Sequence, residues 1–192
     1  MIARFGKPET MPKDFFDDFV KVAEDEARHF RLLASQLVEL GSSYGAFPAH
    51  DGLWESAEAT ADDIAARLAI EHCVHEARGL DVLPTTIVRF QKGGDKATAD
   101  LLHSVVYPEE ISHCAAGIRW FTYVLLRRQV HSPHIEYKTL YEHYEDEEVV
   151  QAFHAVVRTY FKGPLKPPFN IEARNAAGFP LRWYLPLSTK DD

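Results

Sequence analysis

The feature that most constrains the fold of this chain is helical periodicity sustained over long segments. Between residues 12 and 40, apolar side chains recur at steps of three or four, which is the spacing of one face of an α-helix. Two further long segments show the same periodicity, and the sequence contains no strand-like alternation of apolar and polar residues. The sequence therefore predicts an all-α protein built on three long helices.

The first segment is bounded by residues that start and stop helices. Thr10 and Pro12 form a start signal and Gly41 a stop signal, so the sequence predicts a helix over residues 12–40. Its apolar stripe is expected to face the core and includes Phe16, Phe19, Val20, Ala23, Ala27, Phe30 and Leu33. The following residues, "SSYGAFPAHDGLW" (42–54), are rich in turn formers and are predicted to form a surface loop.

The second and third segments carry prolines inside their helical patterns. The second is predicted to begin at Thr60, to kink at Pro84 and to end at Gly93. The third follows the capping residue Asp95 and runs to about residue 129, with Pro108 inside it. Because proline has no amide hydrogen for the carbonyl four residues earlier, Pro108 predicts a kink or a restart of this helix.

Beyond residue 129 the long periodicity gives way to shorter patterns. Two shorter helices are predicted within residues 131–161, followed by the proline-rich loop "KGPLKPPFN" and one more helical turn in the tail. The chain is therefore predicted to be a single domain over residues 1–192. Its core helices would occupy residues 12–130, and residues 131–192 would form a C-terminal extension.

The charge and composition exclude several classes of function. The formal net charge of −8 argues against binding to nucleic-acid backbones or to anionic membranes. No stretch reaches the roughly 18 apolar residues of a membrane span, and the first residues lack the apolar core of a signal peptide. The two cysteines, Cys73 and Cys114, make no disulfide framework. These features predict a cytoplasmic protein with no membrane partner and no nucleic-acid partner.

Two Glu-x-x-His pairs lie on the predicted core stripes. The first long helix carries Glu26 and His29, and the third carries Glu110 and His113. Residues three apart lie on one face of a helix, so each pair can direct two ligand groups at one point. Chance alone gives about one such pair in a chain of this composition, so the count by itself carries little weight. The position of the pairs carries more weight, because a buried glutamate without a partner costs several kcal/mol. The pairs predict half of a carboxylate-bridged dimetal site in a helical bundle.

The second long helix should supply a further carboxylate, and its helical phase leaves two candidates open. These are Glu71 and Glu76, with His72 and His75 between them. Both 64-68-71-75 and 68-72-76-79 form acceptable helical stripes. The two histidines are either additional ligands or hydrogen-bonded histidines at the edge of the core.

Several motifs together resemble a ferritin-like family that is catalogued as domain of unknown function 455. They are "VAEDEARHFRLL", "HEARGLDV", "EEISH" and the tail "LKPPFNIEARNAAGF", which together span nearly the whole chain. The resemblance implies a ferritin-like helical bundle with a dimetal carboxylate site. It favours Glu76 over Glu71 as the ligand from the second helix. The metal-ligating positions that it implies are Glu26, His29, Glu76, Glu110 and His113.

The resemblance also implies a difference at the front of the chain. A ferritin-like site takes a further Glu from a helix that precedes the three long ones, and "MIARFG" matches only the last turn of such a helix. A first helix truncated in this way would leave a groove along the first two long helices, which dimerisation could cover. The expected lining of that groove is drawn from Phe16, Phe19, Ala23, Phe30 and Leu33.

The implied site suits oxygen activation, because two ions held by carboxylates and imidazoles keep open coordination positions. The leading hypothesis is therefore a di-iron oxidoreductase that acts on an unidentified small-molecule substrate, with manganese as the alternative metal. A metal-storage protein would share these ligands without a substrate pocket. A metal-free helical scaffold that binds a partner is the third hypothesis. Arg28, Arg78 and Asp81 are candidates to orient the ligands from outside the site.

Overall fold

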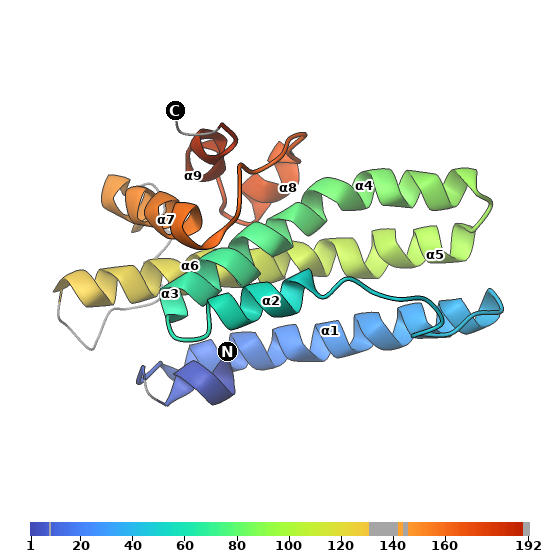
Figure 1. The fold of residues 1–192 in the computed structure, drawn as a ribbon, viewed down its shortest axis with the longest axis horizontal. Coiled ribbons are helices and arrows are strands. Elements are labelled where there is room, and N and C mark those ends of the chain that lie inside the picture. Colours follow the sequence, from blue (N-terminus) through green and yellow to red (C-terminus); the bar gives the residue numbers. More distant parts are fainter. Residues whose placement is uncertain (8, 131–141, 144–145, 190–192) are drawn as a thin grey trace.

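The computed structural model describes residues 1–7, 9–130, 142–143 and 146–189. Within these residues the regular structure is helical and no strand occurs, so the all-α prediction is confirmed. Three long rods lie side by side along the longest axis of the molecule (Figure 1). The rods are α1 (Lys13–Glu39), then α3 (Ile64–Arg67), η2 (Leu68–His75) and α4 (Glu76–Lys92), and finally α5 (Lys96–Leu101), η3 (Leu102–Val106) and α6 (Tyr107–Val130).

The first rod begins and ends almost where the sequence predicts. Pro12 is its N-cap. At the other end Gly41 adopts a left-handed conformation with φ of 76°. The amide of Ser42 bonds the carbonyl of Leu37 at 2.8 Å, and that of Gly41 bonds Val38 at 2.9 Å. This pattern satisfies two of the last carbonyls, and the positive φ explains why glycine ends the helix.

The prediction that the second rod begins at Thr60 is wrong. The helix begins at Ile64, and the side chain of Asp63 caps it by accepting a hydrogen bond from the amide of Ala65 at 2.8 Å. Thr60 instead ends a separate short helix, α2 (Gly52–Ala59), which takes up the last residues of the predicted surface loop. Three acceptor-bearing residues, Thr60, Asp62 and Asp63, could each have capped a helix, and tertiary packing selected the last of them.

Both internal prolines are accommodated without a break in the rods. Pro84 lies inside α4, and the carbonyl of Leu80 that it cannot bond accepts a hydrogen bond from the side chain of Asn170 at 3.1 Å. Pro108 follows the π-helical segment η3, in which the amide of Tyr107 bonds the carbonyl of Leu102, five residues earlier. Of the kink or restart predicted at Pro108, the restart does not occur, and the helix continues through one wider turn.

Replacing Asn170 by alanine is expected to lower the free energy of unfolding by about 2 kcal/mol. The side chain caps α8 (Ile171–Ala176) through the amide of Ala173 and also satisfies the carbonyl of Leu80. A lost N-cap costs about 1 kcal/mol, and an unsatisfied buried carbonyl adds about as much. Urea unfolding monitored by circular dichroism measures the change, with the exposed Asn175→Ala as the control variant. Equal stabilities of the two variants would contradict this account of Pro84.

The core face of α1 differs from the predicted stripe. The buried residues of this helix are Phe15, Phe19, Val22, Asp25 and His29. Val20 and Phe30, which were expected in the core, are 58% and 52% exposed. Among the residues from which the groove lining was expected to be drawn, Phe19 is buried and Phe30 is exposed. Helix α1 packs against α6 and α5 along a face rotated from its most apolar side.

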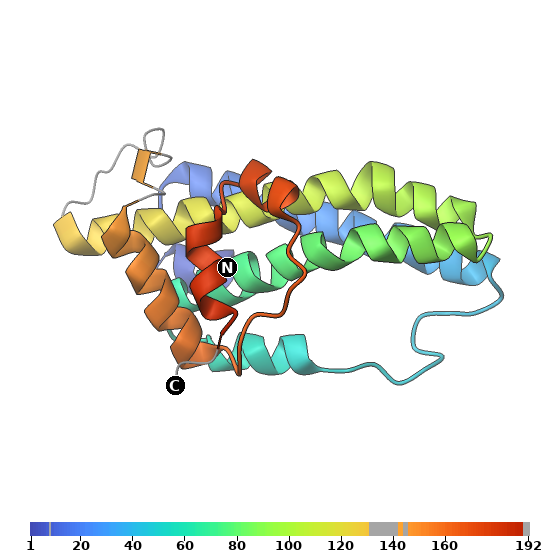
Figure 2. The ribbon, with the colours of Figure 1, turned by 90° about the horizontal axis from the view of Figure 1, so that it is seen from above.

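The C-terminal extension covers one side of the second and third rods (Figure 2). It contains α7 (Glu147–Tyr160), α8, α9 (Leu181–Tyr184) and the 3₁₀ turn η5 (Leu185–Leu187). The helix predicted at the end of residues 131–161 is confirmed as α7, and the one expected before it falls mostly on residues 131–141, outside the described residues. Phe121 of α6 meets Phe153 and Trp183 of the extension in a single aromatic cluster.

The remaining described residues include one helical turn near the front, η1 (Ile2–Gly6). Phe5 of this turn is buried in the main core together with Phe15 of α1. Among the described helices, none combines the length and the apolar character needed to cross a membrane.

Candidate metal centre

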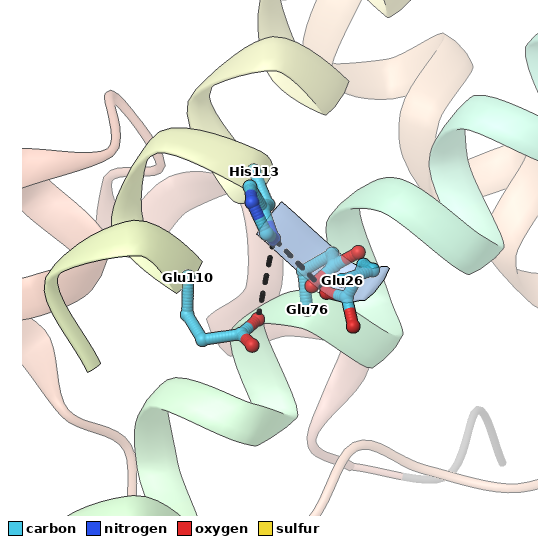
Figure 3. A group of neighbouring side chains, drawn as sticks. All are labelled: Glu26, Glu76, Glu110 and His113. Atoms are coloured by element: carbon cyan, nitrogen blue, oxygen red, sulfur yellow. Dashed lines mark ion pairs between the residues drawn. The ribbon is translucent and has the colours of Figure 1, made fainter. Parts of the chain in front are cut away.

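Four of the five predicted ligands come together in the structure. Glu26, Glu76, Glu110 and His113 each offer a ligand atom, and these atoms all lie within 4.8 Å of one another. Figure 3 shows their side chains directed at one common point. They come from three different rods, because Glu26 lies on α1, Glu76 opens α4, and the other two lie one turn apart on α6.

The fifth predicted ligand, His29, lies at the edge of this group. Its Nδ1 is 3.6 Å from Oε1 of Glu110 and 3.8 Å from Oε2 of Glu26. Its Nε2 is 2.7 Å from Oε2 of Glu109 and hydrogen bonds to it. His29 therefore turns one ring nitrogen toward the four-residue group and holds the other on a carboxylate outside it.

His113 shows the same arrangement from the opposite helix. Its Nδ1 lies 3.1 Å from Oε1 of Glu26, and its Nε2 lies 3.2 Å from Oδ2 of Asp25. Asp25 thus holds the histidine of α6, as Glu109 holds the histidine of α1. In a neutral imidazole whose Nε2 hydrogen is accepted by a carboxylate, Nδ1 keeps its lone pair, which is the usual state of a metal-ligating imidazole.

Arg28 bonds both of the carboxylates that hold the histidines, Asp25 and Glu109. Its Nη2 donates to Oδ1 of Asp25 at 2.9 Å and also to Oε1 of Glu109. Asp25 is fully buried, and it makes a second ion pair with the exposed Lys21. The hypothesis that Arg28 orients the ligands from outside agrees with this geometry. Asp81 instead pairs with Arg174 in another part of the molecule.

Sequence reasoning missed Asp25 and Glu109. Each stands immediately before the glutamate of a Glu-x-x-His pair, so the repeated pattern is an acid followed by Glu-x-x-His. Adjacent residues point about 100° apart on a helix, which sends the first acid across to the partner helix while the glutamate faces the cluster. The repetition of this pattern on two helices was the available signal.

The carboxyl groups of Glu76 and Glu110 share a buried environment. Burial raises the pKa of both groups, and the negative charge of Glu26 raises it further. The pKa of Glu110 is raised further by its hydrogen bond to Glu76 and by the negative charge of Glu76. Without a cation, these carboxyls would hold protons at a pH where exposed glutamates are ionised. The site is thus arranged to favour a bound positive charge.

The pKa values of His113, Asp25 and Glu26 are shifted by the charges of neighbouring residues. Burial alone would lower the pKa of His113, but the neighbouring carboxylates of Glu26, Glu76, Asp25 and Glu110 raise it to about 9. Burial would raise the pKa of Asp25, yet Lys21 and His113 bring it below its usual value. The pKa of Glu26 is lowered, chiefly by His113. The charge balance of the site depends on contacts between α1 and α6.

An orphaned buried atom supports the fit of a metal ion. Nδ1 of His113 is buried and makes no hydrogen bond, although the Glu26 carboxylate is close. A buried polar atom without a hydrogen bond is uncommon and calls for a partner. Two imidazole nitrogens and three carboxylates are a donor set that transition-metal ions accept. Glu26, His29, Glu76, Glu110 and His113 are therefore the residues that could hold the metal.

Of the two candidate carboxylates on the second rod, the structure places Glu76 with the other predicted ligands. Glu76 lies in the four-residue group and Glu71 does not. His72 packs its ring against Phe19 with centroids 4.8 Å apart, and burial lowers its pKa to about 3. His75 hydrogen bonds to Oγ of Ser56 at 3.1 Å. Neither histidine belongs to the four-residue group.

Asp25→Asn and Glu109→Gln are expected to weaken metal binding about 10- to 100-fold, the usual effect of losing a carboxylate that orients a metal-ligating histidine. Each amide has nearly the same shape as the carboxylate that it replaces. Because an amide can donate as well as accept a hydrogen bond, it no longer forces the imidazole to carry its hydrogen on Nε2. Competition with a metal-binding dye measures the affinity. Glu24→Gln, an exposed change next to Asp25, is the matched control. Wild-type affinity in both variants would show that these acids do not support the ligands.

The chain matches a known family along nearly its full length. The sequence model of the family described as "Protein of unknown function (DUF455)" matches residues 1–185, so the chain belongs to this family. The chain is also 33% identical over 165 residues to an uncharacterized protein of Haemophilus influenzae. That alignment covers 86% of this chain and 51% of the relative, so the chain spans about half the relative's length. No solved structure matches, and the ferritin-like affiliation stays a prediction.

Proposed function

We propose that this member of the DUF455 family is a dimetal carboxylate protein whose ions are held between α1, α4 and α6. The reciprocal arrangement of the two histidines is the observation that carries the proposal. Asp25 and Glu109 take the outer nitrogens of His113 and His29, which leaves both Nδ1 atoms facing Glu26 and Glu110. A salt-bridge network without a metal has no need to repeat this geometry on two helices.

The number and kind of donors favour two ions. Three glutamates offer six oxygen atoms, and the two histidines add two nitrogens. Glu76 and Glu110, which hydrogen bond to each other, would hold the ions together with Glu26 and the two histidines. Mixed imidazole and carboxylate ligation suits iron, and manganese is the alternative.

We further propose that the centre activates oxygen to oxidise a small-molecule substrate. Two bound iron ions would supply the electrons and the open coordination positions for that chemistry. The chain's own residues set the access to the site. Glu26 is half exposed, whereas Glu76 and Glu110 are mostly buried. Solvent and substrate would therefore reach the centre along the Glu26 side of α1, while the packed side of α6 excludes water.

Metal content tests the proposal that the chain binds two metal ions. Oxygen uptake separately tests the proposal that the bound ions activate oxygen. Protein purified without chelators is expected to contain about two transition-metal ions per chain. Iron-loaded protein is expected to consume oxygen when a reductant is supplied, without assembling into cages on size-exclusion chromatography. Two ions without oxygen uptake would support metal storage and overturn the oxidoreductase proposal. Metal-free protein that also fails to bind added Fe²⁺ or Mn²⁺ would overturn both.

His113→Ala is expected to reduce bound metal to less than about a tenth of the wild-type amount at limiting metal. The variant removes a candidate ligand atom and the contact that His113 makes with Oδ2 of Asp25. His72→Ala and His75→Ala are matched controls from the second rod and are expected to retain most of the metal. Inductively coupled plasma mass spectrometry measures all three variants. Equal losses would mean that the second rod binds metal through its histidines.

A further inference from the structure

A cationic cavity lies between the second rod and the C-terminal extension. It has a volume of about 210 Å³ and is lined by residues of η2, α4, the proline-rich loop and α8. Arg78 and Asp81 of α4 face it, two and five residues after Glu76. Those steps correspond to about 200° and 140° around the helix. The cavity is therefore on the other side of α4 from the metal centre.

The charge of this cavity contrasts with that of the whole chain. Four cationic side chains line it, and Asp81 is the carboxylate among its lining residues. The chain as a whole carries a formal net charge of −8. The cationic residues are Arg78, Lys162, Lys166 and Arg174. A concentration of positive charge in a concave site of an acidic protein attracts anions selectively.

Arg174 lines the cavity with a buried guanidinium that packs against aromatic rings and has one nitrogen without a hydrogen-bond partner. The residue is 2% exposed, and its Nε and Nη2 donate to the two oxygens of Asp81 at 2.9 and 2.6 Å. Its Nη1 is buried and has no hydrogen-bond partner. Because Asp81 already fixes the guanidinium, that donor is held in place before any ligand arrives. Buried arginine N–H groups without acceptors are costly, and an anion in the cavity could supply one.

Arg78 holds one wall of the cavity in position. Its Nη1 donates to the backbone carbonyl of Lys166 at 3.0 Å and lies 3.8 Å from Oδ2 of Asp81. This contact ties α4 to the proline-rich loop that carries Lys166. The lining also contains apolar residues, among them Phe161, Leu165 and Phe169. The cavity thus combines cationic residues with apolar residues suited to a hydrocarbon or aromatic group.

We propose that this cavity binds a small phosphate monoester. The phosphate, which carries close to two negative charges at neutral pH, would accept hydrogen bonds from Nη1 of Arg174 and from Lys162 and Lys166. The organic part would lie against Phe161 and Phe169. A dianion matches the excess of cations over the Asp81 carboxylate better than a single carboxylate would. The site is separate from the metal centre and does not depend on the function proposed for it.

Isothermal titration calorimetry with phenyl phosphate tests the proposal on the full chain with its native metal content. We expect saturable one-to-one binding that weakens about tenfold or more in the double variant Lys162→Ala/Lys166→Ala, as expected when charged hydrogen bonds are lost. This variant keeps the Asp81–Arg174 pair and the backbone carbonyl that Arg78 bonds. Lys92→Ala, an exposed lysine at the far end of α4, is the matched control and should bind as the wild type.

Three results would overturn the proposal. The first is the absence of saturable binding up to about 10 mM phenyl phosphate. The second is unchanged affinity in the folded double variant, which would place the phosphate at the metal centre or elsewhere. The third is an affinity for inorganic phosphate equal to that for phenyl phosphate, which would remove the role of the apolar lining residues. Thermal melting confirms that each variant is folded before titration.

Discussion

Gly117→Ala is expected to lower the free energy of unfolding by about 3 kcal/mol, at the upper end of the usual cost of overpacking. Gly117 lies on α6, where that helix packs against η2 of the second rod. A Cβ at this position would be 2.1 Å from the backbone oxygen of His72 and 3.0 Å from Sγ of Cys73. A backbone oxygen cannot rotate away, so the two rods would have to separate.

The size of this effect can be isolated with a second glycine. A Cβ on Gly79, inside α4, would come no closer than 3.9 Å to Oε2 of Glu110, which is ordinary contact. Gly79→Ala should therefore gain roughly 0.5–1 kcal/mol, the usual benefit of alanine in a helix interior. Chemical denaturation of both variants provides the comparison. Stabilisation by both substitutions would show that the rods tolerate a wider separation than this contact indicates.

Asp81→Asn is expected to lower the free energy of unfolding by about 3 to 5 kcal/mol, the cost of breaking a buried ion pair by neutralising one partner. Asp81 and Arg174 are both almost fully buried and form a two-point contact at 2.9 and 2.6 Å. Asparagine retains the shape of the side chain but leaves the Arg174 charge uncompensated among the rings of Phe169, Phe179 and Tyr184. The contact holds the C-terminal extension on α4.

An exposed ion pair provides the control for this prediction. Lys13 and Asp17 are paired one turn apart on the surface of α1. Asp17→Asn should change stability by less than about 0.5 kcal/mol, because solvent screens such pairs. Thermal and urea unfolding of the two variants measure the difference. If both substitutions had equally small effects, the Asp81–Arg174 pair would not anchor the extension.

The helical class and the positions of the two Glu-x-x-His pairs could be predicted from the sequence. Long runs of 3/4 spacing predicted the three rods, and local capping residues such as Gly41 and Asp95 predicted several of their ends. These are local properties, because periodicity and caps depend on residues within a few positions of one another. The two Glu-x-x-His pairs could be found for the same reason, since three-residue spacing fixes which side chains share a helix face.

The choice of Glu76 required information beyond helical phase, and here the resemblance to a family supplied it. The π-helical segment η2 immediately before Glu76 shifts the face of every later residue. An ideal helical wheel therefore could not decide between Glu71 and Glu76. The four-residue group in the structure contains Glu76, which agrees with the position that the resemblance implied.

The buried face of α1 and the acids that support the histidines depended on contacts between rods that lie far apart in the sequence. The expected core face of α1 was correct for Phe19 and His29 but wrong for Val20 and Phe30, and Glu26 is half exposed. The packing of α1 against α6 buries Asp25 instead. Contacts from Asp25 to His113 and from Glu109 to His29 join residues 88 and 80 positions apart. No local pattern encodes such distances. They arise when buried charges find partners across the interface between two rods, since each charge left unpaired there would be unfavourable.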